Sequence, residues 1–204
     1  MSLRLAVLAS GGGSNLQALI NRFNRNDTPN SPLRVALVIS DRVDSGALQR
    51  ARSANIEAVH IEMKHRPVGL VTRELLAALE SADVDLIALA GFLQLVPSAI
   101  VRRYPNRIVN IHPALLPRFG GKGMYGINVH RAVLQSGDKK SGATVHYVNE
   151  AYDEGDIIQQ REVPVLPGDT PETLAARVLE VEHQLYPDVL EELARRMAGE
   201  ELHA

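Results

Sequence analysis

The chain has 204 residues, of which 45% are hydrophobic, and this size and composition fit one globular domain with a buried core. The formal net charge of −2 argues against a general nucleic-acid binder, and the absence of cysteine excludes disulfides, thiol catalysis and cysteine-ligated zinc. No apolar run approaches the ~18 residues that cross a bilayer, and the glycine-rich start does not resemble a secretory signal. We therefore expect a cytoplasmic protein without membrane or nucleic-acid partners.

The first half of the chain alternates short apolar runs with amphipathic helical patterns. The apolar runs predict strands at residues 3–9, 34–39, 57–61, 84–89 and 107–111. The segments between them predict helices at residues 14–23, 46–54, 68–81 and 97–103, and a polar loop at residues 24–32. This order predicts an α/β fold with a Rossmann-like, mostly parallel sheet and helices on both of its faces. Such sheets bind ligands at the carboxyl ends of their strands.

The second half of the chain has a different pattern. A glycine-rich segment at residues 118–128 predicts a mobile loop, followed by a short helix at residues 129–135. Two late strands, at residues 143–148 and 157–163, are expected to be antiparallel. Residues 171–197 predict a long helix interrupted near Pro187, and residues 197–204 a frayed tail. We expect one domain over residues 1–204, in which residues 113–204 complete the α/β half formed by residues 1–112.

The first strand leads into a glycine-rich turn, SGGGSN at residues 10–15, and then into a helix. Glycines let backbone N–H groups approach an anion closely, and a helix N-terminus adds partial positive charge. The spacing matches neither the dinucleotide motif GxGxxG nor the P-loop, so a single phosphate monoester is the favoured ligand. The alternative interpretation is a tight turn whose Ser14 caps the helix.

Asn110 and His112 lie two residues apart at the end of the fifth predicted strand, just before Pro113. Residues i and i+2 of a strand project from the same face, so both side chains would reach one pocket. An amide can donate to a developing oxyanion or accept from an amine, and an imidazole titrates near neutral pH. A nearby carboxylate would keep the imidazole protonated. We select Asp153 in the late turn, although spacing alone leaves three other acids open: Glu150, Glu154 and Asp156.

The remaining histidines lack a metal-ligand spacing such as HExxH, and no serine has the setting of a nucleophile elbow. We therefore expect no metal. Surface or packing roles are expected for the other six histidines: His60, His65, His130, His146, His183 and His203.

Several segments together resemble the phosphoribosylglycinamide formyltransferases, the folate-dependent enzymes of purine synthesis. The matching segments, which extend to about Pro187, are LAVLASGGGSNLQALI, LIALAGFLQLV, RIVNIHPALLP, GKGMYG, SGATVHYVNEAYDEGDIIQQ and VEHQLYP. The combination of GSNLQAL with NIHPxLLP is highly specific, whereas NIHPxLLP alone marks the wider formyltransferase group. The resemblance implies the formyltransferase fold, with an antiparallel addition of strands towards the C-terminus.

The resemblance also implies roles for residues at matching positions. The family positions that bind the substrate phosphate and ribose correspond to Gly13, Ser14, Asn15 and Glu182. The folate-binding positions fall on Arg66, Leu93, Gln94, Leu95, Val96 and Asn110; Gln94 stands where some members have arginine, and Arg66 is the nearest basic residue in its loop. The catalytic positions fall on Asn110, His112 and Asp153.

The implied reaction transfers the formyl group of 10-formyltetrahydrofolate, a co-substrate, to the amine of glycinamide ribonucleotide in de novo purine (IMP) biosynthesis. Asn110 and protonated His112 would stabilise the oxyanion, and Asp153 would raise the pKa of His112. The glycine-rich loop would close over the site and exclude water. Both substrates are small molecules, and the chain is expected to be a monomer or a homodimer.

Three alternatives are a hydrolase of formyl folate, a methionyl-tRNA formyltransferase, and a non-catalytic module that binds a phosphosugar. The hydrolase would have an additional N-terminal domain and the tRNA enzyme a C-terminal RNA-binding domain. We expect neither, because the first strand begins near Met1 and the sequence ends after one long helix. A binding module would explain the glycine-rich turn but not Asn110, His112 and Asp153.

Overall fold

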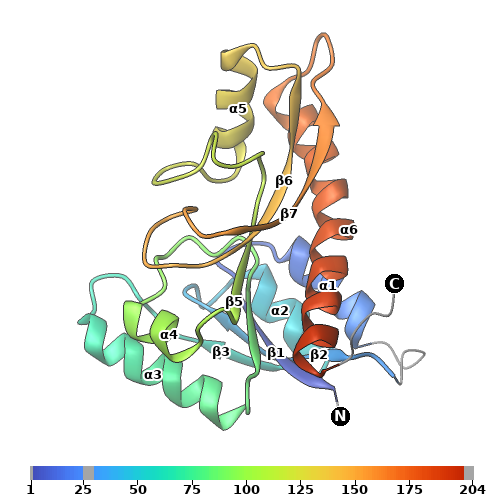
Figure 1. Cartoon of the computed structure of the whole chain (residues 1–204). Coiled ribbons are helices and arrows are strands. Elements are labelled where there is room, and N and C mark those ends of the chain that lie inside the picture. The colour runs from blue at the N-terminus through green and yellow to red at the C-terminus, as the bar shows by residue number, and fades with distance from the viewer. Residues whose placement is uncertain (1, 25–29, 200–204) are drawn as a thin grey trace.

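The computed structural model describes residues 2–24 and 30–199. Within them, seven strands form one sheet in the spatial order β3-β2-β1-β4-β5-β6-β7 (Figure 1). The strands are β1 (Leu3–Leu8), β2 (Leu33–Ser40), β3 (Glu57–His60), β4 (Leu86–Leu89), β5 (Ile108–His112), β6 (Lys140–Tyr147) and β7 (Ile157–Pro164). Strands β1 to β5 are parallel, β6 is antiparallel to β5, and β7 is antiparallel to β6. The predicted fold class is confirmed.

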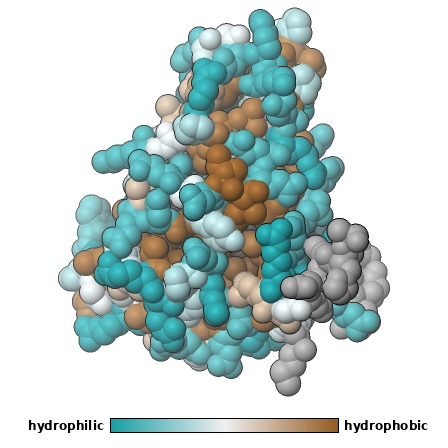
Figure 2. All heavy atoms as spheres, in the orientation of Figure 1, coloured by the Kyte–Doolittle hydropathy of each residue, from teal (hydrophilic) through white to brown (hydrophobic). Residues whose placement is uncertain are grey.

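Helices cover both faces of the sheet. They are α1 (Ser14–Phe23), α2 (Gly46–Ser53), α3 (Val68–Ser81), α4 (Ser98–Arg103), α5 (Ile127–Ser136) and α6 (Pro171–Met197). The apolar residues of β1 alternate between two buried clusters, because successive side chains of a strand point to opposite faces. Leu5 and Val7 pack with α1, α2, α5 and α6, whereas Ala6 and Leu8 pack with α3 and α4. On the face shown in Figure 2, hydrophilic groups surround an apolar area near the middle.

One predicted boundary differs from the structure in a way that affects the site. The fifth strand was expected to end at residue 111, but β5 continues to His112 because β6 pairs with it along its length. In that register Asn110 lies opposite His146, and His112 lies opposite Thr144. Of the segments expected to be irregular, residues 25–29 of the polar loop and residues 200–204 of the tail lie outside the described residues.

The prediction that the last helix is interrupted near Pro187 is wrong. Helix α6 runs through Pro187 for 27 residues, although a proline inside a helix removes one backbone hydrogen bond and costs ~3 kcal/mol. Fully buried side chains flank Pro187 on both sides, among them Tyr186 and Leu190. Packing of both halves of α6 against the sheet offsets this cost, and the local sequence pattern does not reveal that packing.

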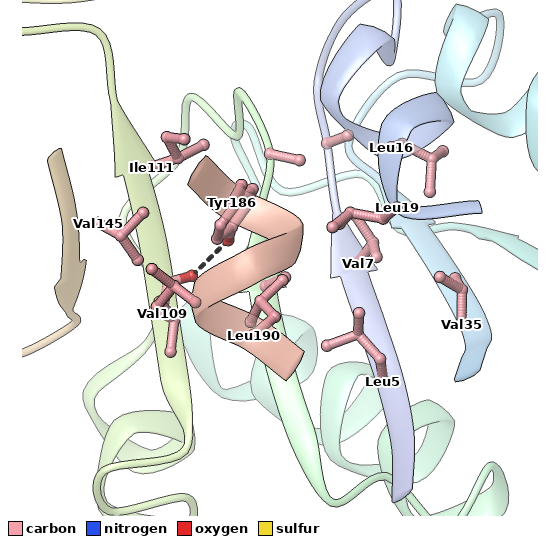
Figure 3. Close-up of a cluster of buried hydrophobic side chains, with 14 of the residues drawn as sticks. Leu5, Val7, Leu16, Leu19, Val35, Val109, Ile111, Val145, Tyr186 and Leu190 are labelled. Atoms are coloured by element: carbon pink, nitrogen blue, oxygen red, sulfur yellow. Dashed lines mark hydrogen bonds between the residues drawn. The ribbon is translucent and has the colours of Figure 1, made fainter. Parts of the chain in front are cut away.

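Tyr186 joins α6 to the centre of the sheet (Figure 3). Its side chain is 0% exposed, and its hydroxyl lies 2.9 Å from the carbonyl oxygen of Val109 on β5 and 3.0 Å from that of Leu89 on β4. A hydroxyl has one hydrogen, which the two carbonyl groups share. The tyrosine therefore holds two neighbouring strands and the long helix in one fixed arrangement.

Replacing Tyr186 with Phe should lower the free energy of unfolding by about 1–3 kcal/mol, because a buried hydrogen bond is lost and carbonyl groups stay unsatisfied. Urea denaturation monitored by circular dichroism measures this difference. Tyr152→Phe is the matched control, since Tyr152 is 39% exposed and should tolerate the same change. Equal effects of the two substitutions would contradict the role assigned to the buried hydroxyl.

Candidate active site

A cavity of about 400 Å³ opens at the carboxyl ends of β1, β4 and β5. Its lining includes the glycine-rich turn after β1, the segment after β4, Asn110 on β5, Tyr125 in the loop before α5, and Glu182 on α6. Parallel sheets bind ligands at this edge, where the strand order reverses between β1 and β4. Segments distant in sequence therefore meet in one pocket.

The glycine-rich turn lines this cavity, and the space beside two of its glycines is open. A Cβ atom added at Gly11 or Gly12 would meet no atom within 4 Å. Gly13 has a different constraint, since its φ is +75° and an added Cβ would lie 2.8 Å from the Cα of Ala47. Ser14 is the first residue of α1, and no side chain caps this helix, so the alternative in which Ser14 is the cap does not describe the turn.

Asn15 and Glu182 meet at the wall of the cavity beside this turn. The amide of Asn15 donates to Glu182 Oε2 over 2.6 Å. Burial raises the pKa of Glu182 to about 7, and the hydrogen bond from Asn15 opposes that shift. The amide oxygen of Asn15 is buried without a hydrogen-bond partner among the described residues. Two polar groups at this wall therefore retain hydrogen-bonding capacity for a ligand.

Arg50 on α2 binds the glycine-rich turn through a hydrogen bond and was not among the predicted site residues. Its guanidinium donates to the carbonyl oxygen of Gly12 over 2.8 Å and to Gln17 over 2.9 Å. The sequence offers no signal for this contact, because α2 approaches the turn only through the packing of the two helix–strand units. Its positive charge adds to that of the helix N-terminus near the turn.

The structure brings Asn110, His112 and Asp153 together around the Asp153 carboxylate. Asp153 Oδ2 accepts from the backbone N–H of Gly121 over 2.9 Å and lies 3.5 Å from His112 Nδ1. Asp153 Oδ1 accepts from Asn110 Nδ2 over 3.3 Å. Burial acts to raise the pKa of Asp153, but the facing imidazoles of His146 and His112 and the hydrogen bond from the Gly121 backbone together lower it. The carboxylate is therefore ionised at neutral pH.

His112 lies behind the wall of the cavity and is 3% exposed. Its Nε2 donates to the carbonyl oxygen of Phe119 over 2.8 Å, while its Nδ1 faces Asp153. Burial lowers the pKa of His112, and the Asp153 charge and the Phe119 carbonyl oppose this effect. In this arrangement the imidazole does not line the cavity, whereas Asn110, on the same face of β5, does.

Two further histidines, for which surface or packing roles were predicted, lie beside the candidate site residues. His146, 2% exposed, has its Nε2 3.0 Å from Asn110 Nδ2 and 3.6 Å from Asp153 Oδ1. His130 on α5 lines the cavity, and its Nδ1 is buried without a partner among the described residues. Burial and the neighbouring His112 lower the pKa of His130 to about 4. Only the strand register and helix packing, which spacing does not specify, place these rings here.

The predicted folate-binding residues occupy different environments. Leu93 lines the cavity, and Val96 is buried in the core with α3 and α4. Gln94 donates to Asp41 Oδ2 over 2.9 Å, and Leu95 is 43% exposed. Arg66 forms a two-pronged ion pair with Glu74, at 2.6 and 2.8 Å, and does not line the cavity. Their contact with folate stays a prediction.

Residues 3–190 match the family model described as formyl transferase. A chloroplastic phosphoribosylglycinamide formyltransferase of Arabidopsis thaliana is 47% identical over 92% of this chain and 64% of its own length. The phosphoribosylglycinamide formyltransferase of Escherichia coli (strain K12) is 37% identical over 92% of this chain and 85% of its own length. The chain belongs to the formyl transferase family.

A solved member of this family has the same fold. The crystal structure of glycinamide ribonucleotide transformylase 1 from Symbiobacterium toebii superposes with a TM-score of 0.86 at 42% identity, covering 95% of this chain and 88% of that one. The chain spans 64% of the length of the Arabidopsis relative.

The described residues contain no helix that is both long and apolar enough to cross a membrane. A group of three or more potential metal-binding side chains was likewise not found among residues 2–24 and 30–199.

The burial of His130 predicts a pH-dependent stability. Between pH 6.5 and about 4 the unfolded chain protonates this ring and the folded protein does not, so stability falls as the pH is lowered through that range. Replacing His130 with Asn should reduce the slope of unfolding free energy against pH by up to one proton, or about 1.4 kcal/mol per pH unit. Urea midpoints measured from pH 7.5 to 4.5 give both slopes.

Glu182 affects the stability with the opposite sign between pH 4.5 and about 7, because its pKa is raised in the folded protein. Glu182 is present in both proteins, so the difference in slope between the variant and the parent measures the effect of His130 alone. His60→Asn, at an exposed position on β3, is the control and should leave the slope unchanged. An unchanged slope in the His130 variant would contradict the effect assigned to burial.

Proposed function

We propose that the protein transfers the formyl group of 10-formyltetrahydrofolate to the amine of glycinamide ribonucleotide, a step of purine biosynthesis. One observation carries this proposal. The open glycine turn and Asn110 line the same cavity, and the ionised Asp153 lies directly behind Asn110 together with His112. The proposal is also supported by the names of family members that are 37% to 47% identical.

The phosphate of the ribonucleotide would bind at Gly13, Ser14 and Asn15. Backbone N–H groups at the uncapped start of α1 and the charge of Arg50 favour an anion there. The buried Glu182 would accept hydrogen bonds from the ribose hydroxyl groups. The glycinamide end would then lie towards Asn110, at the other wall of the cavity.

Formyl folate would supply the one-carbon group. Phe92 and Leu93 give the cavity an apolar wall suited to a flat aromatic ring. Gln94, Leu95, Val96 and Arg66 complete the folate contacts that we propose from the family resemblance. No metal is part of the proposed reaction.

In the proposed reaction the amine nitrogen bonds to the formyl carbon, the bond from that carbon to the folate nitrogen breaks, and an amine proton reaches the departing nitrogen. His112 turns from the Phe119 carbonyl and donates its Nε2–H to the oxygen on which negative charge develops. Burial lowers the pKa of His112, and the facing Asp153 carboxylate opposes this effect and so favours the protonated imidazole that the oxyanion would meet. Holding both substrates side by side supplies a further share of the rate.

One incubation separates this function from its alternatives. The protein is mixed with 10-formyltetrahydrofolate, with and without glycinamide ribonucleotide, and both tetrahydrofolate and the formylated ribonucleotide are quantified. We expect stoichiometric formation of the two products only when the ribonucleotide is present. Release of formate without it would indicate a hydrolase, and binding without turnover would indicate a phosphosugar module. A parallel incubation with methionyl-tRNA in place of the ribonucleotide tests for the tRNA enzyme.

Replacing His112 with Ala should lower kcat by at least ~10²-fold, because the group that stabilises the oxyanion is removed. Steady-state assays at saturating substrate measure this change. His60→Ala, on the exposed edge of the sheet, is the control and should retain full activity. A fully active His112 variant would overturn the assignment.

Replacing Ser14 and Asn15 together with Ala should raise the KM for the ribonucleotide ~10-fold or more while changing that for formyl folate little, because charge-assisted contacts with phosphate are lost. Initial rates with each substrate varied in turn give both constants. Asn21→Ala, at an exposed position of the same helix, is the matched control. Equal increases in the two KM values would place the phosphate elsewhere.

A further inference from the structure

His146 lies at a defined position relative to Asn110. The two residues are partners in the antiparallel ladder between β5 and β6, so their side chains share one face of the sheet. On the other side of β6, the pairing with β7 shifts register between Val145 and His146. Register shifts of this kind re-aim side chains and are common beside active sites. The pairing of β5 with β6 thus places the His146 side chain next to that of Asn110.

The surroundings of His146 fix which ring nitrogen carries hydrogen. Its Nδ1 lies 2.8 Å from the carbonyl oxygen of Tyr147, which can only accept, so Nδ1 is the donor. The neutral ring therefore presents a lone pair at Nε2. A Cβ atom added at Gly155 would collide with the Tyr147 carbonyl, so glycine there lets that carbonyl stay where it meets the ring.

This tautomer determines the orientation of the Asn110 amide. Asn110 Nδ2 lies 3.0 Å from His146 Nε2, which carries the lone pair, and 3.3 Å from Asp153 Oδ1. The amide has two N–H groups, and the two acceptors engage both. A flipped amide would place its oxygen against two acceptors, which is unfavourable. The orientation is therefore single, with the amide oxygen left for the cavity that Asn110 lines.

We propose that His146 is a positioning residue that, with Asp153, holds Asn110 so that its amide oxygen accepts an N–H of the attacking amine. This inference rests on the proposed function and divides the roles of the site. Asn110 orients the nucleophile, and stabilisation of the oxyanion falls to His112. It differs from the expectation that Asn110 donates to the oxyanion, since both of its N–H groups are already engaged.

A double-mutant cycle tests this coupling. His146→Leu removes the acceptor and should lower kcat about tenfold with little change in either KM, because the amide becomes free to rotate. In an Asn110→Ala background the same substitution should have less than a twofold effect, since there is no amide left to position. His146→Gln, whose side-chain oxygen can accept, should recover much of the loss. Multiplicative, independent losses in the two backgrounds would overturn the proposal.

Val145→Ala is the matched control for folding, because Val145 is the buried neighbour of His146 on β6 and packs in the core on the opposite face of the sheet. It should lower the urea midpoint without lowering kcat, and the loss in His146→Leu should exceed that of this control.

A second readout needs no catalytic activity. In ¹⁵N-labelled protein the side-chain amide protons of Asn110, assigned by their loss in Asn110→Ala, should be shifted and protected from exchange. They should lose this protection in His146→Leu and keep it in His146→Gln. Unchanged protection in His146→Leu would overturn the positioning role, whether or not formyl transfer is observed. Loss of protection in a protein without transfer activity would instead refute the proposed function while supporting the contact.

Discussion

The arrangement of the site depends on the contacts that the Asp153 carboxylate makes with its neighbours. The carboxylate joins Asn110 and His112 on β5, His146 on β6 and the backbone of Gly121 in the glycine-rich loop. Asp153 itself has a φ of +57°, an uncommon conformation for a residue with a side chain, in the turn between β6 and β7. The antiparallel strands return this turn over the end of β5. Their addition to a parallel sheet therefore creates a charged centre that β1 to β5 alone would lack.

Burial limits how much positive charge this centre holds. Burial lowers the pKa of His112 and of His130, and a charge on His146 or His112 lowers the pKa of the neighbouring ring further. The single carboxylate of Asp153 opposes these effects at His112. Like charges in a poorly hydrated site repel strongly, so a positive charge on one ring disfavours a positive charge on its neighbour. Asp153 therefore raises the pKa of the ring that is proposed to meet the oxyanion, against the larger effect of burial.

The sequence predicted those parts of the site that follow from local periodicity. The glycine turn and the Asn110–His112 pair lie at strand ends, and a spacing of two residues is enough to place the pair on one face. Asp153 could not be separated from neighbouring acids, because the register between β5 and β6 decides which acid of the turn returns to His112. His146 was missed for the same reason. Its partner on β5 is set by pairing between distant segments, and a shift of one residue would turn it away.

Helix α6 connects the cavity wall at which we propose that phosphate binds with the centre of the sheet. Glu182 and Tyr186 are four residues apart, so they lie on the same face of the helix. The Tyr186 hydroxyl fixes that face against carbonyl groups of β4 and β5, and Glu182 is then held at Asn15 one turn away. A bend at Pro187 would move these contacts relative to the sheet. The uninterrupted course of the helix through Pro187 therefore serves the cavity as well as the core.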